Sequence, residues 1–439
     1  MPDPHQPSAA SDASVDSPGG GIAARRAANI IVKAALERRD GFDTALGPAL
    51  SGLEPRDRGF ARLLALTVLR RLGPIDALLE PRLKKPPPEA VMAILRLGVA
   101  QLLFIDMPPH AAVAATVAMT EKEARSFKGL VNAILRGLQR DAPPPPAPGL
   151  HAPPWLYARW KSAYGEAEAD AISARIAGEP PTDLTPRDPL EAEALAQAVE
   201  GTVLPGGSVR TARRGDLVDW PDFAEGRWWV QDAAAAIPAR LLAAQPGEDV
   251  LDLCAAPGGK TMQLAATGAA VVALDRSPAR LKRLTENLAR TGLNAEIVTA
   301  EGDRWEDERT FDAVLLDAPC SATGAFRRQP DVLWAASPVD IPRLAMVQAR
   351  LLDAAARRVR PGGRLVYAVC SLEPEEGEAQ GAAFLVRHPE FEAWPPDPGE
   401  AGTPLGAQTP EGGARIMPSL TEPLGGMDGF YVLRCRRRV

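Results

Sequence analysis

Residues 249–261, DVLDLCAAPGGKT, predict a buried strand, a tight glycine turn and the start of a helix. Glycines let the backbone of such a turn approach a ligand closely, and the helix presents free amide hydrogens to a carboxylate or phosphate. A second strand, residues 270–275, ends in Asp275. Rossmann-type sites use a carboxylate there to accept hydrogen bonds from ribose hydroxyls. Asp303 follows a third strand and offers an acceptor for an adenine amine. The pattern predicts an α/β sheet with a cofactor at its carboxyl edge.

Two further apolar runs end in cysteines. Residues 315–321, LLDAPCS, and 365–371, LVYAVCS, each predict a buried parallel strand. Cys320 and Cys370 therefore fall at the carboxyl ends of their strands, where open α/β sheets place ligands and chemistry. A thiolate aimed at a substrate from that edge is a candidate nucleophile.

The glycine turn has other interpretations. Residues 259–261, GKT, end like a phosphate-binding P-loop, but that motif requires glycine where this chain has Cys254, and Pro257 lacks an amide hydrogen. A nicotinamide site needs a GxGxxG spacing that the turn does not have. A packed turn without a ligand would explain Gly258-Gly259 alone. It would not explain acids at successive strand ends, namely Asp275, Asp303 and Asp317.

The 439-residue chain is long enough for two or three domains. Residues 1–21 are rich in Ser, Ala, Asp, Pro and Gly and predict a disordered tail. Residues 22–141 predict an all-helical domain. Residues 142–154 contain seven prolines and predict an extended linker. Residues 155–222 predict a small α+β subdomain, and alternating strands and helices predict a parallel sheet in residues 223–439.

Charge is unevenly distributed between these regions. Residues 22–141 carry 19 Lys+Arg against 12 Asp+Glu, whereas the whole chain has a net charge of −6. A basic domain on an acidic chain favours a polyanion partner, and an ordinary solvated helical surface would give the same pattern. Within this domain, Thr120 and Glu123 have the spacing of a helix-starting capping box.

Other features narrow the class of protein. The longest apolar stretch, residues 90–105, is too short and too polar for a membrane span. The four histidines have no metal-binding spacing. The four cysteines form no CxxC pair and predict reduced thiols in a cytosol-like compartment. We therefore expect a cytoplasmic protein with no metal, membrane or DNA partner, and take a monomer as the default.

Three segments resemble the RNA 5-methylcytosine methyltransferase family: Cys254–Lys260, DAPCSATG at 317–324 and YAVCSLEPEE at 367–376. Residues 22–141 are also similar to the helical fold of the antitermination factor NusB, including LVNAILR at 130–136. The resemblance covers most of the chain. It implies a multidomain fold: an all-α NusB-like RNA-binding domain, a small α+β subdomain, and a Rossmann-like class I methyltransferase domain.

The resemblance implies S-adenosyl-L-methionine as methyl donor and carbon 5 of a cytosine in 16S ribosomal RNA as acceptor. Matched by position, Cys370 would be the nucleophile, Cys320 would assist product release, and Asp317 would contact both the cofactor and the target base. The cofactor-binding set would be Cys254, Ala255, Ala256, Pro257, Gly258, Gly259, Lys260, Asp275, Asp303 and Asp317. The family usually has threonine before the nucleophile, where this chain has Val369.

Carbon 5 of cytosine is a poor nucleophile, and addition of a thiolate at carbon 6 makes it enamine-like. DNA cytosine methyltransferases use the cysteine of a Pro-Cys motif, here Cys320, whereas the RNA family uses the later one, Cys370; the whole-motif match favours Cys370.

Two alternative functions remain open for the protein as a whole. One is a catalytically silent RNA-binding or antitermination factor, and the other is an ATPase.

Several neighbouring residues leave more than one interpretation. Four glutamates follow Cys370 within two turns; they suit a helix start but should disfavour a thiolate. They are Glu373, Glu375, Glu376 and Glu378. Lys260 could pair with an acid or meet solvent. Arg327, Arg328 and Trp334 could contact RNA backbone and stack a base, or form a solvated loop.

Overall fold

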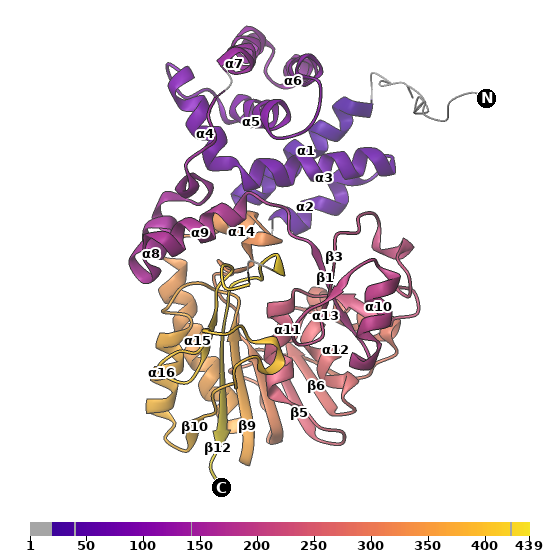
Figure 1. The fold of residues 1–439 in the computed structure, drawn as a ribbon, viewed down its shortest axis with the longest axis vertical. Coiled ribbons are helices and arrows are strands. Elements are labelled where there is room, and N and C mark those ends of the chain that lie inside the picture. Colours follow the sequence, from indigo (N-terminus) through magenta and orange to yellow (C-terminus); the bar gives the residue numbers. More distant parts are fainter. Residues whose placement is uncertain (1–19, 39–40, 142, 422–423) are drawn as a thin grey trace, which may run out of the picture. The chain divides into compact units, whose positions relative to one another are not determined.

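The computed structural model describes residues 20–38, 41–141, 143–421 and 424–439. The tail expected at residues 1–21 lies outside this part, except that Gly20 and Gly21 begin the first helix. The chain forms two compact units, residues 1–146 and 147–439 (Figure 1).

The described residues of the first unit form helices joined by turns, in agreement with the predicted all-α fold. Helix α5 is buried on nearly every side, as its apolar sequence predicts. Thr120 is not a helix start: it lies in the last turn of α6, and its hydroxyl donates to the Val117 carbonyl at 2.6 Å. The helices are α1 (Gly20–Glu37), α2 (Gly41–Leu50), α3 (Pro55–Arg70), α4 (Leu72–Leu79), α5 (Glu89–Leu103), α6 (Pro109–Glu123) and α7 (Lys128–Asp141).

The second unit begins inside the segment expected to be an extended linker. Pro148–His151 forms a 3₁₀ turn, and His151 is buried. Ala152 then packs with helices α8 (Pro154–Tyr164) and α9 (Glu166–Ile176) around Trp160. The second half of the linker is therefore part of the folded unit, because its apolar residues have a core to join.

A small four-stranded antiparallel sheet follows in the order β2-β3-β1-β4. Its core packs Leu184 and Val209 against Trp228 and the short helix α10. Strand β4 lies beyond residue 222, so this subdomain extends past the predicted boundary. The elements are β1 (Thr182–Pro186), α10 (Ala192–Ala198), β2 (Thr202–Val203), β3 (Val209–Thr211) and β4 (Trp228–Val230).

The large sheet has eight strands in the order β10-β12-β9-β8-β5-β6-β7, with β11 paired to β12 (Figure 1). Strands β5 to β9 pair parallel to one another, whereas β12 pairs antiparallel with β9, β10 and β11. Its strands are β5 (Asp249–Leu253), β6 (Ala270–Asp275), β7 (Glu296–Thr299), β8 (Phe311–Asp317), β9 (Val359–Val369), β10 (Phe391–Ala393), β11 (Ala414–Ile416) and β12 (Phe430–Arg437).

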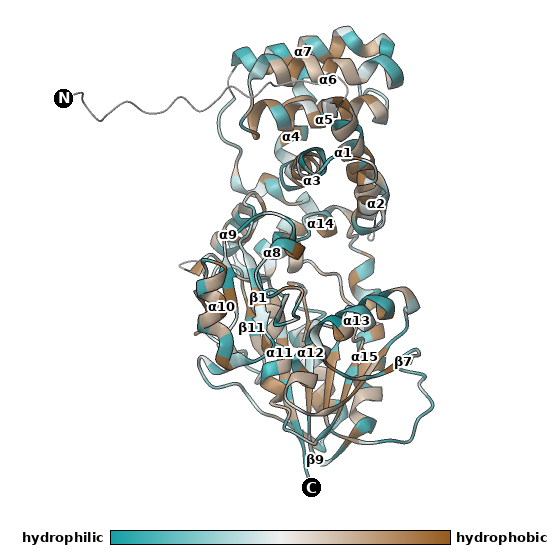
Figure 2. Ribbon diagram, turned by 90° about the vertical axis from the view of Figure 1, so that its right-hand side faces the viewer, coloured by the Kyte–Doolittle hydropathy of each residue, from teal (hydrophilic) through white to brown (hydrophobic). Residues whose placement is uncertain are grey.

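Helices connect these strands, and apolar residues between the layers form the core. Figure 2 shows hydrophobic residues along the strands of the large sheet, and Leu251, Val314 and Leu316 are wholly buried there. The helices are α11 (Ala233–Leu242), α12 (Gly259–Ala266), α13 (Pro278–Thr291), α14 (Asp331–Ala335), α15 (Asp340–Arg358) and α16 (Glu378–Arg387).

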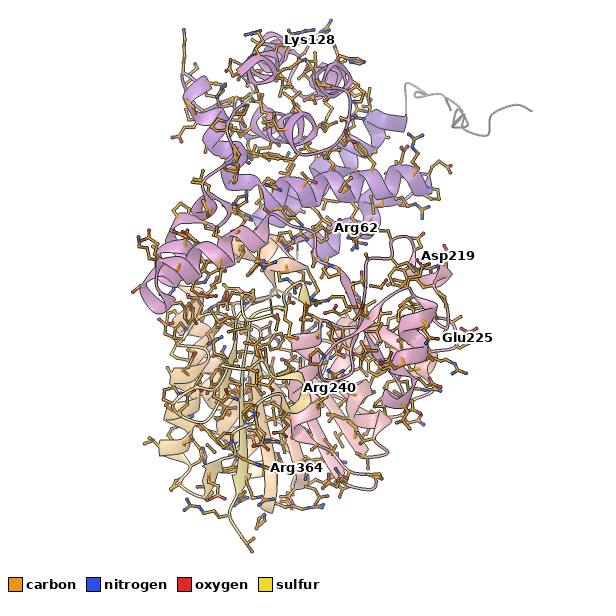
Figure 3. The ribbon with its side chains drawn as sticks, in the orientation of Figure 1. Arg62, Lys128, Asp219, Glu225, Arg240 and Arg364 are labelled. Atoms are coloured by element: carbon orange, nitrogen blue, oxygen red, sulfur yellow. The ribbon has the colours of Figure 1, made fainter. Side chains whose placement is uncertain are left out.

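The strand order creates the position for a ligand. The chain runs outward from β5 through β6 to β7, then returns to the other side of β5 for β8 and β9. Open α/β sheets bind ligands outside the carboxyl ends of their strands at such a reversal. The opposite edge carries charge pairs: Arg364, labelled in Figure 3 toward the end of the sheet nearer the C-terminus, donates to the Glu248 carboxylate at 2.9 Å.

Candidate active site

A cleft of about 420 Å³ opens at the carboxyl edge of the parallel strands. Each of these strands contributes a predicted site residue, at its last position or in the loop just after it. They are Cys254 after β5, Asp275 of β6, Asp303 after β7, Asp317 of β8 with Cys320 following, and Cys370 after β9. The residues Ala255 to Lys260 shape the adjoining turn and do not line this cleft.

The glycine turn has the tight geometry that its sequence predicts. Cys254 has a φ of 64° and Gly258 a φ of 107°, both in the left-handed region. Gly258 also precedes the first turn of α12, and a Cβ there would come within 2.8 Å of Leu284. This close approach explains the need for glycine. Burial, followed by nearby Asp275, raises the pKa of the Cys254 thiol, so this cysteine stays neutral.

Two acids of the predicted cofactor set are held by arginines that sequence analysis did not select. The buried Asp275 carboxylate accepts from the amides of Ala256 at 3.2 Å and Ser277 at 2.9 Å, with Arg280 at 3.5 Å. Asp303 accepts from Arg350 of α15 at 3.0 Å. A carboxylate has about four acceptor positions, so both acids keep capacity for a ligand. The position of Arg280, five residues after Asp275 in the first turn of α13, was the available signal.

The two sulfur atoms lie 3.5 Å apart although their residues are 50 positions apart in sequence. Strands β8 and β9 are adjacent and parallel, with Asp317 opposite Ala368, so their carboxyl ends deliver both cysteines to one place. The hydrogen bond with Cys370, then burial, raises the pKa of the Cys320 thiol well above its ordinary value. Cys320 therefore stays protonated and can donate to a thiolate beside it.

Lys260 pairs with an acid, which decides between the two interpretations of this residue. Its ammonium nitrogen donates to Asp317 Oδ2 at 2.7 Å and lies 5.4 Å from the centre of the Phe430 ring. The ion pair links the glycine turn to the Cys320 motif. Val369, the position where the family usually has threonine, is wholly buried in the sheet core.

The four glutamates after Cys370 do not form an unpaired acidic patch. Glu373 and Glu375 each accept from Arg159 of α8, and Glu378 accepts from Arg415. Burial raises the pKa of Glu373, and Arg159 opposes this shift. The expected electrostatic conflict with a thiolate is therefore reduced, because arginines compensate three of the four charges. The remaining one, Glu376, is buried among hydrogen-bond donors.

The expected RNA contacts of Arg327 and Arg328 are not favoured. Arg327 is buried and pairs with Asp232 at 3.3 Å, and Arg328 pairs with the buried Asp428 at 2.6 Å. Trp334 packs at the edge of the core that contains Trp160. These side chains hold the loop after Cys320 in place, a role that their sequence position did not reveal.

A second hollow, of about 650 Å³, lies at the amino edge of the sheet, lined by the first residues of β5 to β8. It contains none of the predicted site residues, so the smaller cleft at the carboxyl edge is the candidate site. Among the residues described, no group of His, Cys, Asp and Glu could hold a metal ion. No helix in the described part of the chain is long and apolar enough to span a membrane.

The fold and this site define a methyltransferase class. The family model "16S rRNA methyltransferase RsmB/F" matches residues 239–435, and the NusB family model matches residues 23–140. The chain is 37% identical over 409 residues to "Ribosomal RNA small subunit methyltransferase B" of Salmonella arizonae, covering 87% of this chain and 95% of that protein. The protein of the same name from Pseudomonas syringae pv. tomato is 37% identical over 443 residues, covering 93% and 95%. The chain belongs to the RsmB/F methyltransferase family.

Solved structures share the fold. The crystal structure of PH0851 superposes with a TM-score of 0.76 at 23% identity, covering 95% of this chain and 99% of that one. A methyltransferase homologue from Pyrococcus horikoshii gives a TM-score of 0.54 at 27% identity, covering 64% and 94%. The predicted fold class is confirmed: a NusB domain precedes a Rossmann-like methyltransferase domain.

Proposed function

We propose that this protein methylates carbon 5 of a cytosine in 16S ribosomal RNA with S-adenosyl-L-methionine, through a covalent bond between Cys370 and carbon 6 of the base. The observation that carries the proposal is the pair of thiols 3.5 Å apart at the edge of a cleft that also contains Asp275, Asp303 and Asp317. The names of the relatives supply the RNA substrate.

Each thiol has a distinct task in this scheme. The Cys370 thiolate adds to carbon 6, which breaks the aromaticity of the base and makes carbon 5 nucleophilic. After methylation, water takes the proton from carbon 5, the electron pair of that C–H bond re-forms the double bond between carbons 5 and 6, and the bond to Cys370 breaks to release a thiolate. Cys320 is a neutral thiol within hydrogen-bond range of Cys370, so it can stabilise the departing thiolate. The target base must leave its stack to reach the cleft.

Asp317 supports the base during this sequence. Its carboxylate lines the cleft between the glycine turn and Cys320, and Lys260 holds one of its oxygens at 2.7 Å. The other oxygen can accept a hydrogen bond from the pyrimidine. Pairing with Lys260 keeps the carboxylate oriented, and it lowers the cost of holding a charge in a partly buried site.

The cleft fits the proposed cofactor. Its volume of about 420 Å³ lies in the usual range for small-molecule sites. Asp275 can accept from ribose hydroxyls and Asp303 from an adenine amine, while Cys254 lines the cleft where the glycine turn begins. When bound there, S-adenosyl-L-methionine supplies the methyl group as a sulfonium.

Two assays on RNA test this function. Cys370→Ala should abolish both tritium transfer from labelled cofactor to unmodified 16S RNA and covalent trapping on 5-fluorocytosine RNA. Cys320→Ala should instead accumulate a protein–RNA adduct. Cys435→Ala changes a cysteine buried in β12 and serves as the matched control with activity retained. If Cys370→Ala still formed the covalent adduct with 5-fluorocytosine RNA and Cys320→Ala did not, the two assigned roles would be reversed. If the wild-type chain transferred no tritium to 16S RNA, the proposal would be refuted.

A further inference from the structure

The two thiols come from separate loops, and something must fix their separation. We define the Cys320 loop as residues 318–324 and the Cys370 loop as residues 370–377. A backbone hydrogen bond joins the two loops where the Gly324 amide donates to the Cys370 carbonyl at 3.0 Å, and the Ala318 amide donates to the Ala368 carbonyl of β9 at 2.9 Å. The residues directly after the cysteines, Ser321 and Ser371, meet through their side chains: their hydroxyl oxygens lie 2.9 Å apart, and both hydroxyls donate to the Glu376 carboxylate.

The Glu376 carboxylate is 0% exposed and accepts hydrogen bonds from both loops. The amide of Ser321 donates to Oε1 at 2.9 Å, and the Ser321 hydroxyl donates to Oε2. The hydroxyl of Ser371 donates to Oε2 at 2.6 Å. Since Ser321 follows Cys320 and Ser371 follows Cys370, one carboxylate connects the backbone positions next to both sulfurs.

A third element completes the connection. Gln348 of α15 donates from Nε2 to Glu376 Oε1 and to the carbonyl of Pro319, both at 3.0 Å. Pro319 directly precedes Cys320, so the Cys320 loop is held on both sides of the thiol. The Glu376 carboxylate is therefore a common acceptor for donors from three elements: the loop after β8, the loop after β9 and helix α15.

A carboxylate suits this position better than a neutral group. It offers about four acceptor sites and no donor, which matches four donors from the surrounding residues. Hydrogen bonds to a charged acceptor are roughly twice as strong as neutral ones. A glutamine would place an NH₂ group against donors and leave some of them unsatisfied. Glu376 does not line the cleft, so it does not contact a ligand there directly.

We propose that Glu376 is a positioning residue that sets the distance between the Cys320 and Cys370 sulfurs. It thereby keeps Cys320 close enough to assist release of the methylated base. The second statement rests on the proposed function, whereas the first concerns the thiols alone and can be tested without RNA.

Oxidation by diamide measures the separation of the thiols directly. The two sulfurs form a disulfide, and diamide takes up the two electrons and two protons released. Glu376→Gln should slow formation of this disulfide about 10-fold, because the loops lose their common acceptor. Loss of the charge acts in the opposite direction: Glu376 helps raise the pKa of Cys320, so its removal should favour the reactive thiolate. A slower reaction therefore reports position rather than charge.

The same variant should show a specific kinetic defect. We expect kcat for RNA methylation to fall about 10²-fold, the usual effect of a displacement near 1 Å, with KM for RNA unchanged. The covalent RNA adduct should accumulate, as for Cys320→Ala. Glu375→Gln is the matched control. The Glu375 side chain is half exposed and its carboxylate pairs with Arg159, whereas the Glu376 carboxylate accepts from Ser321 and Ser371. It should keep wild-type disulfide and methylation rates.

A Glu376→Gln protein with wild-type disulfide rate and adduct lifetime would overturn the inference. A variant with a lowered melting temperature but unchanged thiol chemistry would assign Glu376 a purely structural role. If Glu376→Gln does not fold, Ser321→Ala removes one hydroxyl donor between the loops, and an unchanged disulfide rate there would equally refute the idea. Slow disulfide formation in Glu376→Gln, with no methylation by the wild type, would refute the proposed function and leave the positioning role intact.

Discussion

A buried acid on the strand that precedes the glycine turn gives the protein a pH-dependent stability. Asp252 of β5 is 0% exposed, and burial raises the pKa of its carboxyl to about 7 from an ordinary value of 3.8. Its Oδ2 accepts from the Thr261 hydroxyl at 2.6 Å, whereas Oδ1 has no partner among the described residues. Replacement by asparagine keeps an acceptor for Thr261 and removes the charge.

The sign and size of the effect follow from linkage. Between pH 3.8 and 7 the folded protein holds a proton that the unfolded chain has released. This contribution to stability is fully present below pH 3.8 and is lost as the pH rises through 7. At about 1.4 kcal/mol per pKa unit, raising the pH from 5 to 8 should cost the wild type about 3 kcal/mol through this group.

The assay is urea unfolding of wild type and Asp252→Asn at pH 5, 6, 7 and 8, followed by tryptophan fluorescence. All eight tryptophans lie in residues 147–439, so the signal reports the second unit alone. The variant should gain about 3 kcal/mol relative to wild type across this range. Asp249→Asn, on the same strand but with a half-exposed carboxylate, is the control and should show no such gain. A difference between Asp252→Asn and wild type that is constant with pH would refute the reasoning.

Two other substitutions test the turn and the small sheet. Gly258→Ala should lower the free energy of unfolding by about 1–3 kcal/mol and weaken cofactor binding in calorimetry. The new Cβ would meet Leu284 at 2.8 Å, and the backbone there has a φ of 107°. Unchanged stability and affinity would contradict the tight turn. Arg210→Met should cost about 3–5 kcal/mol in urea unfolding, because it leaves the buried Asp183 carboxylate without the guanidinium that donates to it at 2.7 Å. The added change Asp183→Asn should restore part of that loss.

The sequence predicted the arrangement of the site because short-range patterns determine it. An apolar run followed by a polar residue marks the carboxyl end of a buried strand, and parallel strands bring these ends to one edge. This logic placed Asp275, Asp317, Cys320 and Cys370 in the same region, and the structure brings them to one cleft. It could not give the 3.5 Å between the sulfurs, which depends on the adjacency and register of β8 and β9.

The errors arose where a local rule competed with tertiary contacts. Thr120 has capping-box spacing, yet it is buried in the last turn of α6, and its hydroxyl donates to the Val117 carbonyl of the same helix. The prolines of the linker suggested an extended chain, but Ala152 and His151 are buried in the second unit. For Arg327 the sequence left an RNA contact and a solvated loop both open, and the structure gives neither arrangement: two aspartates distant in sequence, Asp232 and Asp428, pair with this buried side chain. No local pattern contains this information.

The acidic run after Cys370 shows what helix α8 contributes to the candidate site. Arg159 of α8 compensates Glu373 and Glu375, more than 200 positions later in sequence, and the Trp160 indole donates to Glu373 at 3.2 Å. Without this helix, two carboxylates would stand unpaired near the thiols, and a thiolate would become less favourable. The small helical segment thus contributes to the electrostatics of a site that it does not line. A loop that needs its charges for hydrogen bonding can keep them beside a pair of thiols, because cations from another element neutralise their field.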